Sequence, residues 1–256
     1  MDKIVLERAE QGIATVTINQ PEQRNSVTYS MWRSLAETFS ELSSDRSVRT
    51  ILLTGAGTDF SSGANISEFA SIRDDPKKAQ RYEVAVDAAC EAITNAPKPV
   101  IAVMRGYTLG GGAHLAMSAD FRFVHPDAVC GIPASRLSIV YGVKGTRKLL
   151  ALVGLPNAKR ILFSAERFGA AEALEMGFAD RLCEDPMEEA LALARNLSAL
   201  APLSQAGAKY ILNGLVHGQF DDAQADALIN EAAASHDYAE GRAAFNEKRS
   251  PRFTGR

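Results

Sequence analysis

The chain of 256 residues lacks several features that mark particular classes of protein. Its cysteines number only three and show no pair spacing of a metal site, so we interpret Cys90, Cys130 and Cys183 as buried free thiols in a reducing compartment. It has no N-terminal apolar signal core. It also has no apolar run near the roughly 20 residues that span a bilayer. These absences favour a cytoplasmic protein with no metal site and no membrane segment.

A strong excess of one charge is also missing. The chain has 28 Lys and Arg residues against 31 Asp and Glu residues, a net charge of −3. A nucleic-acid binder would show a basic footprint, so we expect no nucleic-acid partner. An anionic ligand would need locally placed cations, because the global field does not attract it. The length favours one large domain, or one domain with an appendage.

Strands and helices alternate through the first two thirds of the chain, which favours an α/β architecture. From about residue 144 the pattern is mainly helical, with one short strand near 179–183 and Ala-rich helices at 188–200 and 222–235. Residues 3–9 and 12–18 predict a hairpin, and Thr28 is a plausible helix cap. The other predicted strands are 48–54, 99–104 and 120–124, and the predicted helices are 28–44, 77–95 and one that starts at 110.

The first glycine cluster only partly matches a dinucleotide-binding fingerprint. Gly55 and Gly57 follow a predicted strand, but Phe60 stands where the third glycine is needed. No helix opens there either. Residues 142–146 likewise lack the spacing of a phosphate loop. A nucleotide site is therefore disfavoured at both places.

The second glycine cluster, residues 110–112, follows a buried strand and opens a predicted helix. Glycine lets a ligand approach the backbone closely. The first turn of a helix has N–H groups without internal partners, and its dipole favours negative charge. These properties suit an oxyanion. The alternative is that the glycines only permit tight packing of helix on strand, and the spacing alone leaves both open.

Several ordered motifs resemble those of one family. Residues 59–66 read DFSSGANI, and residues 106–120 read GYTLGGGAHLAMSAD. Both resemble signatures of the crotonase superfamily, which includes the enoyl-CoA hydratases and isomerases. Shorter matches are residues 21–25, residues 170–180 (AAEALEMGFAD) and residues 244–249 (AFNEKR). The resemblance thus extends over nearly the whole chain.

This resemblance implies a fold and an assembly. It implies an α/β fold in which ββα repeats form a spiral, followed by a helical C-terminal trimerisation region. We place the core with the acyl-CoA site at 1–195 and the helical region at 196–256. The expected assembly is a homotrimer or a dimer of trimers. Coenzyme A is expected as part of the substrate, with no prosthetic group.

The resemblance also implies roles for individual residues. The peptide N–H groups of Ala64 and Gly111 correspond to the family's oxyanion hole, which binds the thioester oxygen as it becomes an enolate oxygen. Tyr141 falls near the acyl pocket. The implied coenzyme A contacts are Arg24 for the phosphates, Asn65 and Ile66 beside Ala64, and Phe245 and Lys248, which in the family often belong to a neighbouring subunit.

Two positions depart from the family pattern. The hydratases carry two catalytic glutamates, and here these positions hold His114 and Ala134. Adding water across a double bond needs both a base and an acid, and alanine supplies neither. His114 is a candidate general acid–base because the ordinary histidine pKa lies near 6.5. Its position at a helix start should disfavour the cation. Tyr141 and Arg136 are further candidates, as a proton donor and a carboxylate holder.

Two functions therefore stay open. The first is an acyl-CoA thioester enzyme whose reaction is isomerisation, decarboxylation, hydrolysis or carbon–carbon cleavage rather than simple hydration. The alternative is a non-catalytic or nearly inactive acyl-CoA-binding protein, in which the glycines and Ala64 serve binding alone.

Overall fold

The computed structural model describes residues 3–72, 74–218 and 220–256. A central sheet of six strands runs through the body, in the order β1-β2-β3-β4-β6-β9, and a small sheet has the order β5-β7-β8. Only β1 is antiparallel to its neighbour in the central sheet. The strands are β1 Ile4–Arg8, β2 Ile13–Ile18, β3 Thr50–Gly55, β4 Val100–Met104, β5 Tyr107–Leu109, β6 Phe121–Val124, β7 Val129–Gly131, β8 Arg167–Gly169 and β9 Arg181–Leu182.

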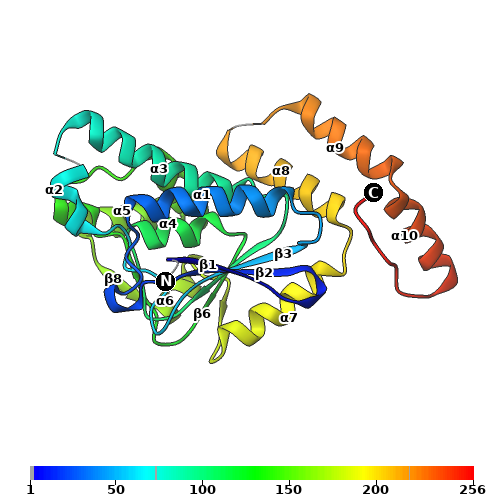
Figure 1. The fold of residues 1–256 in the computed structure, drawn as a ribbon, viewed down its shortest axis with the longest axis horizontal. Helices are drawn as coiled ribbons and strands as arrows, with labels where there is room; N and C mark the ends of the chain where they lie inside the picture. Colours follow the sequence, from blue (N-terminus) through cyan, green and yellow to red (C-terminus); the bar gives the residue numbers. More distant parts are fainter. Residues whose placement is uncertain (1–2, 73, 219) are drawn as a thin grey trace.

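Helices cover both faces of the central sheet (Figure 1). Alternate side chains of one strand point to opposite faces. Ile51 and Leu53 of β3 pack into the main core with α1 and α3, whereas Leu52 packs into a second core with α7. The helices are α1 Tyr29–Ser44, α2 Phe69–Ile72, α3 Pro76–Thr94, α4 Gly111–Ser118, α5 Val143–Ser164, α6 Ala170–Glu175, α7 Pro186–Ser198, α8 Pro202–His217, α9 Asp222–Ala234 and α10 His236–Glu247.

The longer predicted elements are confirmed. Strands β1 and β2 form the expected antiparallel hairpin. Thr28 caps α1, and its hydroxyl accepts a hydrogen bond from the Met31 N–H at 3.3 Å. All five residues of β4 are buried, as its apolar run predicts for a strand covered on both faces. The small sheet was not predicted, because strands of three residues are too short to display a period of two.

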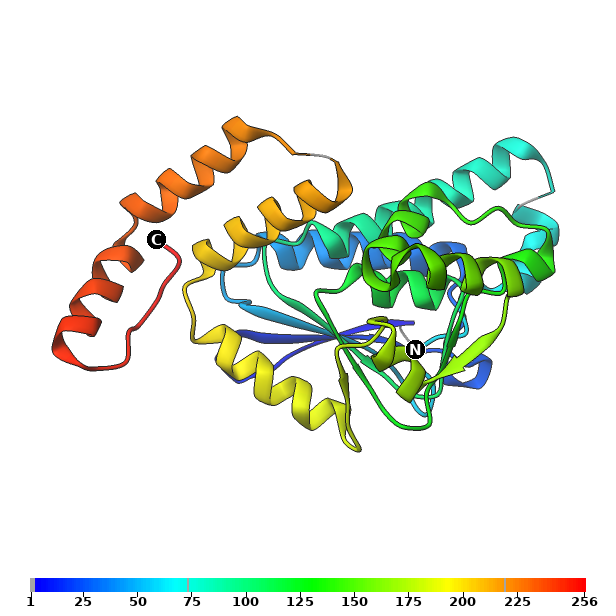
Figure 2. The ribbon, with the colours of Figure 1, turned by 180° about the vertical axis from the view of Figure 1, so that it is seen from behind.

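The last three helices form a C-terminal arm at one side of the body (Figures 1 and 2). Helix α8 lies against the body, and α9 and α10 extend away from it. The final residues return to the arm, where the buried Asp237 carboxylate accepts hydrogen bonds from the backbone N–H groups of Thr254 and Gly255, each at 2.7 Å. The predicted boundary between 195 and 196 falls within α7, and the division itself stays a prediction.

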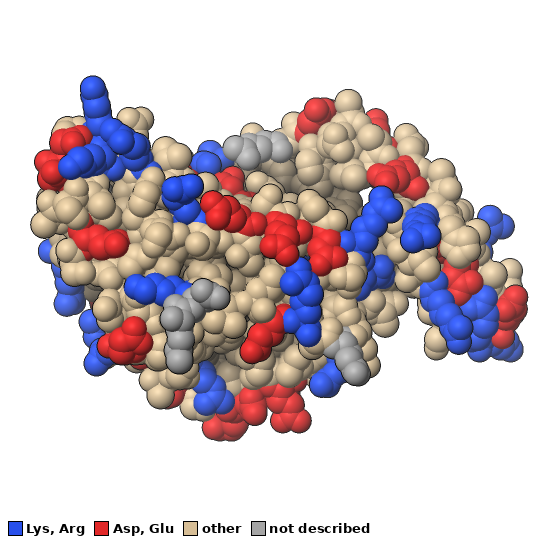
Figure 3. All heavy atoms as spheres, in the orientation of Figure 1, with Lys and Arg blue, Asp and Glu red and all other residues tan. Residues whose placement is uncertain are grey.

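Charges of both signs are intermixed over the face in Figure 3. Within the described part of the chain, no helix is long and apolar enough to cross a membrane. The prediction for the thiols is right for Cys90 and Cys130, which are free and buried. It is wrong for Cys183, which is only partly buried because it follows the short edge strand β9.

Asn25 joins the loop before α1 to the loop after β3. Its side chain is fully buried, and its backbone has a φ of 53°, in the left-handed region that Asn tolerates. The amide Nδ2 donates to the carbonyl oxygens of Ala56 at 2.8 Å and Asp59 at 2.6 Å, and Oδ1 accepts from the Gln20 N–H at 2.9 Å. One side chain therefore links the loop before α1 to the start of the segment that contains Ala64.

We expect Asn25→Ala to lower the free energy of unfolding by about 3 kcal/mol, because it leaves buried carbonyl groups and one N–H without partners. Urea denaturation measures the change. The matched control is Arg24→Ala, since Arg24 is also left-handed (φ 52°) but exposed, and should change stability by less than about 0.5 kcal/mol. Equal losses in both variants would contradict the assigned role.

Candidate functional site

The residues of the two signature motifs line one cavity of about 130 Å³. It lies between the start of α4, the loop that contains Ala64, one face of α3 and residues 132–142. Among the sequence-predicted residues, the cavity brings together Ala64, Ile66, Gly111, His114, Ala134 and Tyr141. Hollows of about 420 and 490 Å³ flank α8, but neither contains any of these six residues.

Two residues that line this cavity, Ala64 and Gly111, have backbone N–H groups without an acceptor among the described residues. Val27 pairs with the loop on both sides of Ala64, donating to the Gly63 carbonyl at 2.7 Å and accepting from the Asn65 N–H at 2.9 Å. This pairing bypasses the Ala64 N–H. Gly111 is the first residue of α4, where an N–H has no partner inside the helix. Neither N–H donates a hydrogen bond to another residue in the described ranges.

The spacing between these two groups depends on glycine. A Cβ atom on Gly63, whose φ is 94°, would lie 2.9 Å from the Gly111 nitrogen and 2.5 Å from the Leu109 carbonyl oxygen. A Cβ atom on Gly112 would lie 2.4 Å from the Ser61 carbonyl oxygen. Gly112 therefore permits the tight packing of α4, and Gly63 permits the close approach of its loop to Gly111. The oxyanion role of the second cluster stays a prediction.

His114 projects from α4 into the same cavity. Its side chain is buried, and its Nε2 atom has no hydrogen-bond partner among the described residues. Burial, reinforced by the cations Lys148 and Lys144, lowers the pKa of His114 to about 3. The direction agrees with the expectation that the cation is disfavoured. The size of the shift could not be predicted, because the sequence does not reveal this burial.

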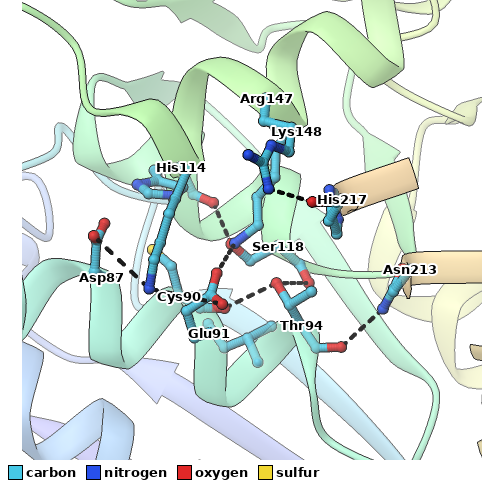
Figure 4. A network of polar contacts seen from close by, with 12 residues as sticks. Asp87, Cys90, Glu91, Thr94, His114, Ser118, Arg147, Lys148, Asn213 and His217 are labelled. Atoms are coloured by element: carbon cyan, nitrogen blue, oxygen red, sulfur yellow. Dashed lines mark hydrogen bonds and ion pairs between the residues drawn. The ribbon is translucent and has the colours of Figure 1, made fainter. Parts of the chain in front are cut away.

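A chain of polar contacts lies behind His114 (Figure 4). The buried Lys148 ammonium donates to the Ser118 hydroxyl at 3.0 Å and forms an ion pair with Glu91 at 3.3 Å. The Ser118 hydroxyl in turn donates to the His114 carbonyl oxygen at 2.8 Å. A cation is thus fixed beside the imidazole, which therefore stays neutral at physiological pH.

Tyr141 closes the cavity on the side of α5. Its hydroxyl donates to the Gly110 carbonyl at 3.4 Å, and its ring centroid lies 5.9 Å from that of His114. Burial, followed by nearby acidic groups that include Glu83 and Asp87, raises the pKa of Tyr141 well above its ordinary value. The hydroxyl therefore stays protonated and can donate a hydrogen bond.

Two carboxylates of α3 also line the cavity, and the sequence motifs assign no role to either. Glu83 is exposed, and Asp87, one turn further along the helix, is half-buried. Burial raises the pKa of Asp87, and Lys144, at 4.0 Å, opposes that effect. The spacing of four residues places both on one helix face. That spacing is a weak sequence signal, because it does not say that this face borders a cavity.

The structure places some of the predicted coenzyme A residues beside the cavity and others at the end of α10. Asn65 and Ile66 adjoin Ala64, and Arg24 is exposed with its guanidinium 4.7 Å from the centroid of the Tyr107 ring. The candidate Arg136 is exposed and does not line the cavity. Phe245 and Lys248 lie at the end of α10, outside the cavity, and 84% of Phe245 is exposed. One chain does not bring them to the site.

Comparisons with known proteins agree with the motifs. Residues 8–256 match the family model described as enoyl-CoA hydratase/isomerase. The chain is 34% identical to the "Probable enoyl-CoA hydratase echA6" of Mycobacterium leprae, over 96% of this chain and 97% of that protein. It is 31% identical to the short-chain-enoyl-CoA hydratase of Clostridium acetobutylicum, over 97% and 96%. An enoyl-CoA hydratase/carnithine racemase structure from Magnetospirillum magneticum superposes with a TM-score of 0.94 at 35% identity, over 100% and 97%.

The lowered pKa of His114 predicts a pH dependence of stability. In the unfolded chain this histidine takes up a proton below about pH 6.5, whereas the folded chain resists until about pH 3. Stability is therefore lost as the pH falls from 6.5, at up to about 1.4 kcal/mol per pH unit.

We expect the free energy of unfolding to fall by about 2 kcal/mol more in the unaltered chain than in His114→Gln between pH 6.5 and 4.5. Urea denaturation at both pH values measures this difference. The variant is the control, because it retains every other titrating group. Equal losses in the two proteins would mean that His114 is protonated in the fold.

Proposed function

The chain belongs to the enoyl-CoA hydratase/isomerase family, and on this premise we propose that it binds an acyl-coenzyme A thioester and stabilises its enolate. The observation that carries the proposal is the pair of N–H groups, from Ala64 and Gly111, without acceptors at one cavity. The thioester oxygen accepts both hydrogen bonds. Preorganised donors of this kind are strongest where charge develops in the transition state.

The reaction that we propose is not simple hydration. His114 and Ala134 line the cavity at the positions of the two hydratase glutamates, so the altered pair faces the acyl group. Ala134 cannot hold a water or move a proton. His114, with a pKa of about 3, is neutral and serves as a hydrogen-bonding group rather than an acid–base of ordinary strength.

Among the remaining reactions, the cavity favours isomerisation by proton transfer over decarboxylation. Among the described residues, no Lys or Arg lines it, whereas Glu83 and Asp87 do. A substrate for decarboxylation carries a free carboxylate on its acyl group. That carboxylate would meet the like charges of Glu83 and Asp87, and no cation of the described cavity lining would hold it. Arg136, the residue that could have held such a carboxylate, lies outside the cavity. Hydrolysis and carbon–carbon cleavage of neutral acyl groups are compatible with the same lining.

A second candidate function is acyl-CoA binding without turnover. One observation favours it: neither hydratase carboxylate is present, and the imidazole that replaces one of them is buried and neutral. The N–H groups would then hold the thioester oxygen without a reaction. Turnover assays on enoyl, hydroxyacyl and saturated acyl thioesters separate the two functions, since only the enzyme converts any of them.

We propose that the coenzyme A moiety lies over the loop of Asn65 and Ile66, with Arg24 at its phosphates. Ile66 has an exposed fraction of 56% beside the cavity, so an apolar surface is available to the pantetheine arm. Phe245 and Lys248 are too remote within one chain, and we propose that they reach the site from a neighbouring subunit. Their exposure at the end of the arm supports this role.

Gly111→Pro deletes one N–H of the pair, and we expect at least a 10²-fold loss of turnover, the scale for one oxyanion donor. The matched control is Asp222→Pro, because Asp222 is the first residue of α9 and proline is tolerated there. Turnover is measured with the enoyl, hydroxyacyl and saturated acyl thioesters named above. Isothermal titration with butyryl-CoA and crotonyl-CoA measures binding, and circular dichroism checks folding. Full activity of a folded Gly111→Pro protein would sink the oxyanion assignment.

We expect a homotrimer or a dimer of trimers in solution. The arm exposes large apolar side chains that need a covering surface, among them Leu212, Leu215, Val216, Ile229 and Tyr238. Size-exclusion chromatography with light scattering gives the mass, and Leu215→Asp should shift the assembly towards smaller species. A monomer for the unaltered chain would refute the proposal.

A further inference from the structure

Asp87 lines the cavity and is partly shielded from solvent. Its side chain is 35% exposed, whereas Glu83, one turn nearer the N-terminus of α3, is exposed. One turn further on, Glu91 no longer lines the cavity and is paired with Lys148 at 3.3 Å. Of the three carboxylates on this helix face, Asp87 therefore combines access to the acyl group with partial exclusion of solvent.

The other titratable groups of the cavity are poor bases. The conjugate acid of His114 has a pKa of about 3, below the ordinary value for a carboxylic acid, near 3.9. Tyr141 holds its proton, because burial raises its pKa well above the ordinary value. Burial shifts Asp87 in the opposite sense from His114, towards a stronger base. A proton acceptor for an acyl α-carbon gains from such a shift.

We propose that the Asp87 carboxylate is the catalytic base that removes a proton from the acyl α-carbon. This inference rests on the proposed enolate chemistry. The C–H bond breaks, and its proton goes to a carboxylate oxygen. Its electron pair forms the carbon–carbon double bond of the enolate, and the thioester oxygen takes the negative charge between the N–H groups of Ala64 and Gly111. Return of the proton to the α- or γ-carbon completes an exchange or an isomerisation without any further reactant.

Lys144 positions this carboxylate. Its Nζ atom lies 4.0 Å from Asp87 Oδ2 and 3.8 Å from Glu91 Oε2. The Lys144 side chain therefore reaches from α5 to two acidic groups of α3, and Figure 4 shows these two helices. Because the cation lowers the pKa of Asp87, it keeps the carboxylate ionised and ready to accept a proton. The other titratable groups around Asp87 are Glu83, Cys90 and Glu91 on α3, His114 on α4, Tyr141 before α5, and Lys148 on α5.

The test follows hydrogen exchange at the α-carbon, which requires no knowledge of the overall reaction. Butyryl-CoA and hexanoyl-CoA are incubated with the full chain in D₂O, and mass spectrometry measures deuterium incorporation. We expect exchange with the unaltered protein and at least a 10²-fold slower exchange with Asp87→Asn, with dissociation constants within threefold. The control Asp226→Asn alters an exposed carboxylate on α9 and should exchange at the unaltered rate.

A second variant distinguishes a base from a structural residue. Lys144→Met removes the cation that lowers the pKa of Asp87, so that pKa should rise. The base is active only when ionised, and the acidic limb of the exchange rate should therefore move to higher pH. A purely structural role for Asp87 would change the rate without moving this limb.

The outcomes separate the two proposals. Exchange at the unaltered rate by Asp87→Asn overturns the assignment of Asp87 and leaves the enolate chemistry standing. Loss of exchange in His114→Gln but not in Asp87→Asn does the same, and assigns the base to His114. Tight binding of both thioesters without any exchange by the unaltered protein overturns the enolate chemistry and the base together.

Discussion

The site depends on a backbone pairing that leaves two N–H groups without acceptors. The loop at Ala64 is paired through a bridge to Val27, and the same loop is paired through Ser61 to Thr108 in the small sheet. These two bridges hold it against the start of α4. An unpaired N–H beside a cavity costs free energy unless a ligand or water satisfies it. The buried Asn25 adds to this support, because it bonds the loop after β3 at Ala56 and Asp59.

Electrostatics then decides what this arrangement can do. Lys148 is buried next to α4 and bonded to Ser118 and Glu91, so a positive charge lies behind the imidazole of His114. The neutral His114 and the apolar Ala134 line the cavity, at the two positions where the sequence predicts that the hydratase glutamates are replaced. The acidic groups of this cavity lie instead on α3, on a different wall. The chain is similar over nearly its whole length to relatives named as hydratases, and we propose that its proton-transfer group lies on α3.

The longer elements could be predicted from local pattern. The helical spacing of apolar residues in 28–44 matches the buried side of α1, and the unbroken apolar run of β4 matches a strand that is buried throughout. The three-residue strands β5, β7 and β8 contain too few residues for any period. The predicted burial of Cys183 was wrong, because a single apolar residue next to an edge strand does not reveal how much of its side chain is covered.

The sequence by itself determined the family and the pair of glycine-rich segments, and it predicted the replacement of both hydratase glutamates, because each is a matter of residue identity and spacing. Only the tertiary structure decided which N–H groups lack acceptors, since that depends on pairing between Val27, Ala64 and residues far along the chain. It also decided that His114 is neutral and that Asp87 borders the same cavity. Burial and charge proximity arise from groups on separate helices, and no local pattern encodes their distance.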